Sequence, residues 1–392
     1  MMNSMESRCN LRILWYAIIA MLWLVILAVL FVLFLEYGGG INLYQQWKYG
    51  PEDAKTIEQR ILREKYEPFK IMHLNPFTFF FFPLDSKERI KINNDVVSIT
   101  KEGFRGSHPS LAIDKQLGFI IGGSTAFGHY ATSDETTISG YFNGLQDKYY
   151  IVNAGVPSWN STQELHYLVD KLVHYKPALV IAVHGFNDMD LAYSYRKIHK
   201  IKKGAYPIGT PKNFNVILEF FDDITDVPQK KDSHNQSLSQ RVFPEVSRHG
   251  RNILRKFFPK NEVKDPELTE EENQNLAEEL AEHYLNNVKV MNEIVKAFGG
   301  NFVAFLQPVR DLHKENTQAT HQRTQFFGKV RHEIQSRKAD LPVFDLLTIF
   351  DDITYNDPLS LFIDRVHLTD KGNAIFAEQI AEILRKKGLL VQ

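Results

Sequence analysis

Short apolar runs alternate with segments of helical periodicity from residue 117 onward. Five runs have the length and composition of buried strands: Leu117–Ile121, Tyr150–Ala154, Ala178–Val183, Phe302–Leu306 and Val343–Leu347. Strands that alternate with helices form a parallel sheet whose two faces are covered by those helices. The pattern therefore predicts an α/β domain with a parallel sheet between two helical layers.

Three amphipathic segments predict helices of this domain. The first has apolar residues at i, i+3, i+4 and i+7, namely Leu165, Leu168, Val169 and Leu172. The second repeats at intervals of four, at Leu276, Leu280, Tyr284 and Val288, behind a possible capping box formed by Thr269 and Glu272. The last begins near Thr369 and carries its apolar residues on one face: Phe376, Ile380, Ile383 and Leu384. We expect these faces to pack on the sheet.

The run Ile13–Leu35 contains no charged residue and no proline. A helix of this length rises about 35 Å, enough to cross a hydrocarbon core of about 30 Å. A cleaved signal peptide is the alternative, but Leu35–Tyr37 is a poor cleavage site, so an uncleaved transmembrane helix at 13–35 is favoured. Because Arg8 and Arg12 precede the run, residues 1–12 would form a cytoplasmic tail. The rest of the chain would then be periplasmic or otherwise extracytoplasmic, in a single-pass membrane protein.

Residues 36–110 are interpreted as a connector and an irregular or β-rich lead-in, and residues 111–392 as the catalytic-type domain. The aromatic stretch Phe77–Phe82 is interpreted as a buried strand or packing ridge, with an acyl-chain or membrane contact as the alternative. A long insertion at about 190–268 interrupts the strand–helix alternation and carries basic clusters. It is equally consistent with a lid or substrate-binding element and with a solvated insert.

Composition and charge restrict the classes of function. Apolar residues make up 44% of the chain and charged residues 24%, as in ordinary globular proteins rather than disordered ones. The formal net charge of -1 gives no reason to expect a nucleic-acid partner. Cys9 is the one cysteine, which excludes an intrachain disulfide and the paired-cysteine zinc motifs.

A glycine pair precedes a serine directly after the first strand, in Gly122–Thr125. Glycines at this place let the backbone turn sharply and leave the hydroxyl of Ser124 exposed at the strand end. A phosphate-binding loop would need a lysine before the hydroxyl residue, and this segment has none. On its own the motif is better explained as an ordinary tight turn.

A serine nucleophile needs a base, and the base needs a carboxylate that orients it. Of the fourteen histidines, only His367 has an aspartate three residues earlier, Asp364. This spacing lets Asp364 accept the ring Nδ1–H while Nε2 faces outward. Chance alone supplies about one such match, but this pair lies just before the final helix, after the last strand.

Two further strand ends carry residues suited to binding an oxyanion. Gly185–Asp188 follows the third strand, and the amide of Asn187 can donate to a developing negative charge. Asn153–Gly155 ends the second strand. Taken singly, Gly155 and Gly185 are better explained as strand-terminating turns. Together with Ser124 and the Asp364–His367 pair, however, these residues lie where open α/β sheets place their sites.

The ordered series GGS, Gly155, GxND and DxxH resembles the SGNH (GDSL-like) hydrolase family over roughly residues 115–390. The resemblance implies a flavodoxin-like fold, a five-stranded parallel sheet between helices. It implies Ser124 as nucleophile and His367 as general base oriented by Asp364. The backbone N–H groups of Ser124 and Gly155 and the side chain of Asn187 would form the oxyanion hole. One departure is visible, because Gly123 stands where the family has aspartate.

The resemblance implies a serine hydrolase that cleaves an ester through an acyl-enzyme, with no metal or organic cofactor. The substrate would be an acyl or acetyl ester of an envelope sugar, polysaccharide or lipid. Two alternatives remain open. The same residues would serve an O-acyltransferase that modifies an envelope glycan, and an inactive SGNH-like module would bind glycans without turnover.

Overall fold

The computed structural model describes residues 54–66, 73–75, 78–82, 84, 86–194, 269–313, 321–351 and 358–390, with single residues and short groups between 15 and 30. The chain divides into two compact units, Met1–Ile57 with Pro228–Asp265 and Glu58–Val227 with Pro266–Gln392. All five predicted strands belong to the second unit.

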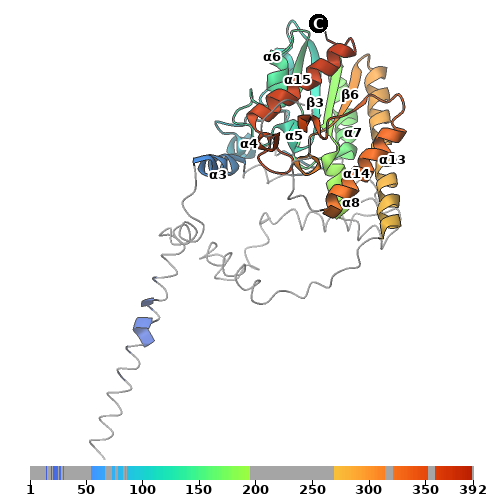
Figure 1. The fold of residues 1–392 in the computed structure, drawn as a ribbon. Coiled ribbons are helices and arrows are strands. Elements are labelled where there is room, and N and C mark those ends of the chain that lie inside the picture. The colour runs from blue at the N-terminus through green and yellow to red at the C-terminus, as the bar shows by residue number, and fades with distance from the viewer. Residues whose placement is uncertain are drawn as a thin grey trace, which may run out of the picture. The chain divides into compact units, whose positions relative to one another are not determined.

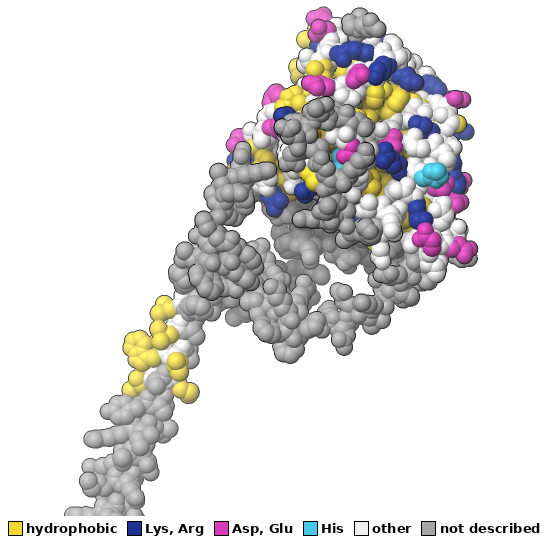
Figure 2. Space-filling view, in the orientation of Figure 1, with side chains coloured by type: hydrophobic (Ala, Val, Ile, Leu, Met, Phe, Trp, Pro, Cys, Tyr) yellow, Lys and Arg dark blue, Asp and Glu magenta, His cyan; other side chains and the backbone are white. Residues whose placement is uncertain are grey.

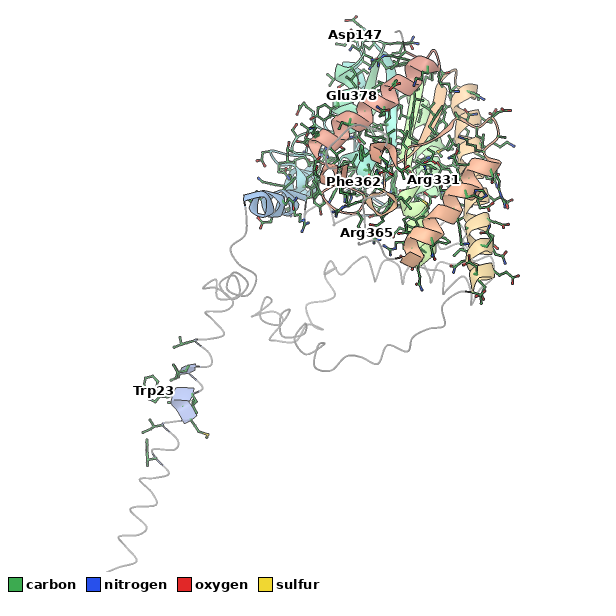
Figure 3. The ribbon with its side chains drawn as sticks, viewed as in Figure 1. Trp23, Asp147, Arg331, Phe362, Arg365 and Glu378 are labelled. Atoms are coloured by element: carbon green, nitrogen blue, oxygen red, sulfur yellow. The ribbon has the colours of Figure 1, made fainter. Side chains whose placement is uncertain are left out.

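In the first unit, the few described residues between 15 and 30 are helical, and their large apolar side chains are exposed: Trp15, Ile19, Met21, Leu22, Trp23, Leu24, Ile26, Leu27 and Leu30. Trp23 is labelled in Figure 3. Most of the predicted membrane span 13–35 lies outside the described residues. Within the part of the chain that is described, no helix has both the length and the apolar character needed to cross a bilayer. The predicted insertion also lies outside the described residues from position 195 onward.

The second unit contains a five-stranded parallel sheet in the order β4-β3-β5-β6-β7 (Figure 1). Its strands are β3 Gln116–Gly122, β4 Tyr149–Asn153, β5 Leu179–His184, β6 Asn301–Leu306 and β7 Val343–Asp345. The predicted parallel α/β sheet is confirmed, and four of the apolar runs match a strand within one residue at each end. The fifth strand is shorter than predicted, since β7 ends at Asp345. This strand order places the topological switch point between the carboxyl ends of the neighbouring strands β3 and β5.

The register of the strands separates the two faces of the sheet. Phe119 pairs with Val152 on one side and Val180 on the other, and Val180 pairs with Phe302. These four side chains belong to one hydrophobic core. The next residue of β3, Ile120, belongs to the core on the opposite face. Because side chains alternate along each strand, the apolar runs bury both faces.

Two helical layers cover these faces (Figure 1). On one face pack α7 Ser161–Asp170, α8 Phe186–Ser194, α13 Glu270–Ala297 and α14 His321–Arg337. On the other pack α6 Ile138–Gly144 and α15 Asp370–Lys386. Short 3-10 helices occur at Pro109–Leu111, Leu172–Tyr175, Arg310–Leu312, Ile349–Asp351 and Pro358–Leu361. The three-layer α/β architecture agrees with the sequence prediction.

The three predicted helices are present, but one residue that was predicted to face the core is exposed. Thr269 and Glu272 form the predicted capping box, and Thr369 caps α15. The side chain of Val169, predicted to pack inward, is 47% exposed. The helix α7 ends at Asp170 and the chain tightens into a 3-10 turn, so the i, i+3, i+4, i+7 pattern does not describe one continuous helical face here.

The lead-in contains more helix than its sequence suggested. It forms α3 Ala54–Tyr66, an antiparallel pair of β1 His73–Asn75 and β2 Phe79–Phe81, and α4 Ser86–Ile92. Phe81 and Phe82 are buried, and the Phe81 ring lies 5.6 Å from that of Trp159. The interpretation of the aromatic stretch as a packing ridge therefore holds for its described part.

Arg105, which lies just before the sheet, joins the lead-in to the short helix α5 Ser124–Phe127. Its fully buried guanidinium pairs with Asp134 at 2.8 Å. It also donates to the carbonyl oxygens of Phe127 and Gly128 at 3.0 and 2.6 Å. The hydroxyl of Tyr66 donates to Gly128 O as well, at 3.1 Å. Burial raises the pKa of Tyr66 to about 12, so it remains a donor throughout the neutral range. These contacts satisfy carbonyl groups at the end of the helix that begins with Ser124.

Candidate active site

Ser124 lies at the carboxyl end of β3, as its sequence motif predicted. Gly122 has a φ of 145°, a value that L side chains rarely adopt, and the chain turns there from β3 into α5. Ser124 is the first residue of α5, and the first backbone bond of that helix runs from Phe127 N to Gly123 O at 3.0 Å. The N–H of Ser124 therefore has no acceptor within the helix, which leaves it able to donate to a bound group.

His367 joins Ser124 to Asp364 in a hydrogen-bonded line. The His367 Nε2 atom lies 2.7 Å from Ser124 Oγ, and Nδ1 lies 2.6 Å from Asp364 Oδ2. The loop that carries the pair directly precedes α15; Figure 3 labels Phe362 and Arg365 on it. The structure thus brings Ser124 next to the Asp364–His367 pair, which lies about 240 positions later in the sequence.

The carboxylate of Asp364 is held in place by its own loop. Oδ1 accepts hydrogen bonds from the backbone N–H of Val366 at 3.0 Å and of His367 at 2.9 Å. Burial by itself would raise the pKa of Asp364, but the imidazole of His367 and these two N–H groups hold the pKa well below its ordinary value. An ionised Asp364 keeps the proton on Nδ1 of His367, so Nε2 accepts from the Ser124 hydroxyl.

Two aromatic side chains that follow α5, those of His129 and Tyr130, lie beside the ring of His367. Neither residue was identified from the sequence. The ring of His129 lies 4.9 Å from that of His367, and the Tyr130 ring lies 5.2 Å away at an interplanar angle of 81°. Tyr130 has a φ of 70°, a left-handed backbone conformation that is uncommon for a bulky residue. Their closeness to Ser124 in sequence is the only signal that would have pointed to them.

A buried polar chain supports the contact between α5 and the His367 loop. Gln307, which follows β6, donates through Nε2 to Thr125 Oγ1 at 2.8 Å. The Thr125 hydroxyl in turn lies 3.4 Å from the carbonyl oxygen of Val366. Both side chains are buried. This connection fixes the neighbours of Ser124 and His367 relative to each other, and no sequence motif reveals it.

Asn187 lies in the first turn of α8, next to Gly123. Its Nδ2 donates to the carbonyl oxygen of Trp159 at 2.7 Å. A Cβ added to Gly123 would approach Asn187 Nδ2 to less than 3.0 Å, a separation that real Cβ atoms essentially never show. The amide therefore lies against the residue that precedes Ser124, and its second N–H is available to a group bound there.

Gly155 has a different environment from the one that the resemblance implied. Its N–H donates to Asn153 Oδ1 at 3.1 Å, so it is already used within its own turn. A Cβ at this position would collide with the backbone of Ala126 and Phe127. Close packing on α5 therefore accounts for the glycine. Later in the same loop, exposed Ser158 has a φ of 67°, directly before the Trp159 carbonyl that Asn187 contacts.

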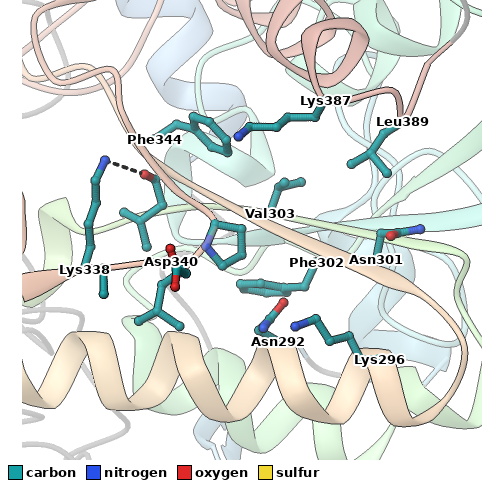
Figure 4. Close-up of a pocket in the computed structure, with 14 residues that line it drawn as sticks. Asn292, Lys296, Asn301, Phe302, Val303, Lys338, Asp340, Phe344, Lys387 and Leu389 are labelled. Carbon is teal, nitrogen blue, oxygen red and sulfur yellow. Dashed lines mark hydrogen bonds between the residues drawn. The ribbon is translucent and has the colours of Figure 1, made fainter.

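A pocket of about 510 Å³ lies elsewhere in the unit (Figure 4). Its lining includes Asn301 and Val343, the first residues of β6 and β7, with Lys296, Lys338 and Lys387 at its margin. Ser124 follows the carboxyl end of β3. Because the strands are parallel, the pocket and Ser124 lie at opposite edges of the sheet. The pocket is therefore separate from the candidate active site.

Charged side chains of both signs are interspersed over the face shown in Figure 2. Among the residues that the structure describes, no three histidine, cysteine, aspartate or glutamate side chains are grouped so that they could hold a metal ion.

The sequence of residues 119–380 matches the family described as GDSL-like lipase/acylhydrolase. No curated protein matches the chain. Among solved structures, a lipase from a goat rumen metagenome shares 11% identity at a TM-score of 0.39, covering 68% of this chain and 97% of the lipase. An acetyl xylan esterase shares 14% at a TM-score of 0.36, covering 68% and 99%.

A lipase/acylhydrolase from Enterococcus faecalis shares 12% identity at a TM-score of 0.33, covering 69% of this chain and 96% of the other. The TM-scores are below 0.5, so the assignment rests on the family match, which spans well over half of the sequence. The chain belongs to the GDSL-like lipase/acylhydrolase family and is an SGNH-type hydrolase.

Proposed function

We propose that the protein hydrolyses a carboxylic ester through an acyl-enzyme on Ser124. The observation that carries this proposal is the continuous line from Ser124 Oγ through His367 to Asp364, with contacts of 2.7 and 2.6 Å. A serine hydroxyl is a weak nucleophile unless a base removes its proton as it attacks, and a fixed imidazole supplies that base. The ionised Asp364 stabilises the imidazolium that forms.

The reaction follows from these positions. Ser124 Oγ bonds to the ester carbonyl carbon as its proton passes to His367 Nε2, and the carbonyl oxygen becomes an oxyanion. The Ser124 N–H and the Asn187 amide would donate to this oxyanion. The tetrahedral intermediate collapses, the bond to the alcohol oxygen breaks, and the imidazolium protonates the departing alcohol. Water, activated by His367, then attacks the acyl-enzyme and releases the acid.

The substrate class proposed is an acyl or acetyl ester of an envelope sugar, polysaccharide or lipid. Support comes from the uncharged run 13–35 behind Arg8 and Arg12, which favours a membrane anchor with the hydrolase outside the cytoplasm. The exposed apolar side chains of Trp15, Trp23 and neighbouring helical residues are consistent with a lipid environment.

The test is turnover of p-nitrophenyl esters of increasing chain length, combined with labelling by a fluorophosphonate serine probe. Wild type should release p-nitrophenol and be labelled, and Ser124→Ala should do neither while remaining folded. A glycan-binding module without catalytic activity would show no Ser124-dependent labelling. Addition of an acetylated donor and a glycan acceptor distinguishes an acyltransferase, which would move the acetyl group rather than release acetate. Substantial turnover by folded Ser124→Ala would refute the proposal.

A further inference from the structure

A buried polar network lies behind the turn that carries Asn187. The carboxylate of Asp188 accepts the Ser161 hydroxyl at 2.6 Å and the Ser161 backbone N–H at 3.3 Å. Asn287 on α13 donates through Nδ2 to the same hydroxyl at 2.9 Å. Asp188 is 2% exposed and Ser161 is fully buried. Ser161 is the first residue of α7, where a negative charge is favoured by the helix dipole and by unpaired N–H groups.

Adjacent residues of α8 therefore make two connections to the start of α7. Asn187 donates to the Trp159 carbonyl at 2.7 Å, and Asp188 accepts from Ser161, two residues further along. A single hydrogen bond leaves a side-chain amide free to rotate about that contact. The second connection holds the backbone from which the Asn187 side chain extends and so restricts where the amide can lie relative to Gly123.

The strand end before this turn is anchored through the same elements. His184 is the last residue of β5. Its Nδ1 atom lies 2.6 Å from Glu164 Oε2 on α7, and its Nε2 atom lies 2.9 Å from the Tyr284 hydroxyl on α13. All three side chains are buried. Burial by itself lowers the pKa of His184, but the Glu164 carboxylate, with Asp188, raises it above its ordinary value. Residues 184–188 are thus held at both ends.

We propose that Asp188 is a positioning residue for the reaction: by binding the start of α7 it holds the Asn187 amide where the oxyanion develops. Asp188 itself does not touch the substrate. The inference rests on the proposed function, because it assigns Asn187 the role of oxyanion donor.

The experiment measures the rate at which a fluorophosphonate probe phosphonylates Ser124, together with kcat and KM for p-nitrophenyl acetate. In the labelling step the Ser124 Oγ–P bond forms, the P–F bond breaks, fluoride leaves and His367 takes the proton. Asn187→Ala should slow both reactions by about 10²- to 10³-fold, as expected for loss of one oxyanion donor. Asp188→Asn should slow both by about 10-fold or more with little change in KM, because the orientation of the donor, not ground-state binding, is lost.

The double variant Asp188→Asn/Asn187→Ala separates positioning from general stability. Once the amide is gone, Asp188→Asn should lower kcat by less than about twofold further, because residues that act as a unit are non-additive. If Asp188→Asn lowered kcat by the same factor in the wild type and in the Asn187→Ala variant, the proposal would be overturned. Should Asp188→Asn not fold, Ser161→Ala removes the same 2.6 Å contact from the other partner and is used in the same cycle.

Glu333→Gln is the matched control. Glu333 is a buried carboxylate on α14 that binds Gln274 and Arg337, away from the turn. It should lower the melting temperature without changing the labelling rate. An unlabelled wild type would refute the proposed function itself, whereas a labelled wild type with multiplicative Asp188 and Asn187 effects would refute only the positioning role.

Discussion

The side-chain amide of Asn187 occupies the space that a side chain at position 123 would need. A Cβ on Gly123 would come closer than 3.0 Å to Asn187 Nδ2 and would lie 3.0 Å from the Trp159 carbonyl oxygen. The backbone at 123 has a φ of -78°, which any residue can adopt. In this structure glycine at position 123 is therefore required by the neighbouring amide rather than by the backbone.

Gly123→Ala should reduce activity far more than stability. The new methyl group must displace the Asn187 amide, because the other close atom belongs to the backbone and cannot yield. We expect kcat to fall by about 10²- to 10³-fold, as for loss of an oxyanion donor. Steady-state kinetics on p-nitrophenyl acetate measures this. In the Asn187→Ala variant, Gly123→Ala should lower kcat little further. If it lowered kcat there as much as in the wild type, the loss would not come from the clash between the new methyl group and the Asn187 amide.

The low pKa of Asp364 predicts how stability depends on pH. A carboxyl group whose pKa is lower in the folded protein stabilises it above the unfolded value of about 3.9. That stabilisation is lost as the pH falls toward the folded-state pKa, which lies lower. The difference in unfolding free energy between wild type and Asp364→Asn should therefore be largest above about pH 4 and should shrink below it. Urea unfolding at several pH values measures the difference, and a pH-independent difference would contradict the ionised state.

The apolar runs were sufficient to predict the sheet, whereas the DxxH spacing suggested the Asp364–His367 pair and the resemblance to the SGNH family assigned its role beside Ser124. Buried parallel strands require continuous apolar runs, and DxxH places the two side chains of Asp364 and His367 on one turn. Both signals are contained in a few consecutive residues. The position of Ser124 opposite His367 then follows from the order of parallel strands, whose carboxyl ends meet at one edge of the sheet.

Features that depend on contacts between distant segments were not predictable in this way. Only the fold shows that Gly155 packs against the backbone of Ala126 and Phe127 in α5, about 30 positions earlier. Likewise Arg105 resembles a surface residue in sequence, yet its guanidinium is fully enclosed by the lead-in and α5. Long charged side chains are almost never buried without such partners, and the sequence does not name the partners.

The nucleophile and the base should act as one unit. Ser124→Ala and His367→Ala should each abolish nearly all ester turnover, and the double variant should be no worse than either. The reason is geometric, because His367 Nε2 lies 2.7 Å from Ser124 Oγ, takes its proton and passes that proton to the departing alcohol, so each step of His367 in acylation depends on Ser124. Single-turnover assays on the purified variants provide the comparison. Multiplicative losses would indicate that one of the two acts elsewhere in the reaction.

Arg105→Met should destabilise the protein by about 3–5 kcal/mol, the usual cost of removing one partner of a buried ion pair. The substitution keeps the bulk of the side chain but leaves Asp134 without its cation and the carbonyls of Phe127 and Gly128 without a strong donor. Urea unfolding gives the free energy. The control is Lys115→Met, which removes an exposed pair with Asp147 at 3.1 Å and should cost less than about 1 kcal/mol. Because the carbonyls belong to the helix that Ser124 begins, kcat should fall as well. If Arg105→Met and Lys115→Met both lowered the free energy of unfolding by the same small amount, the lead-in would not stabilise α5, the helix that begins with Ser124.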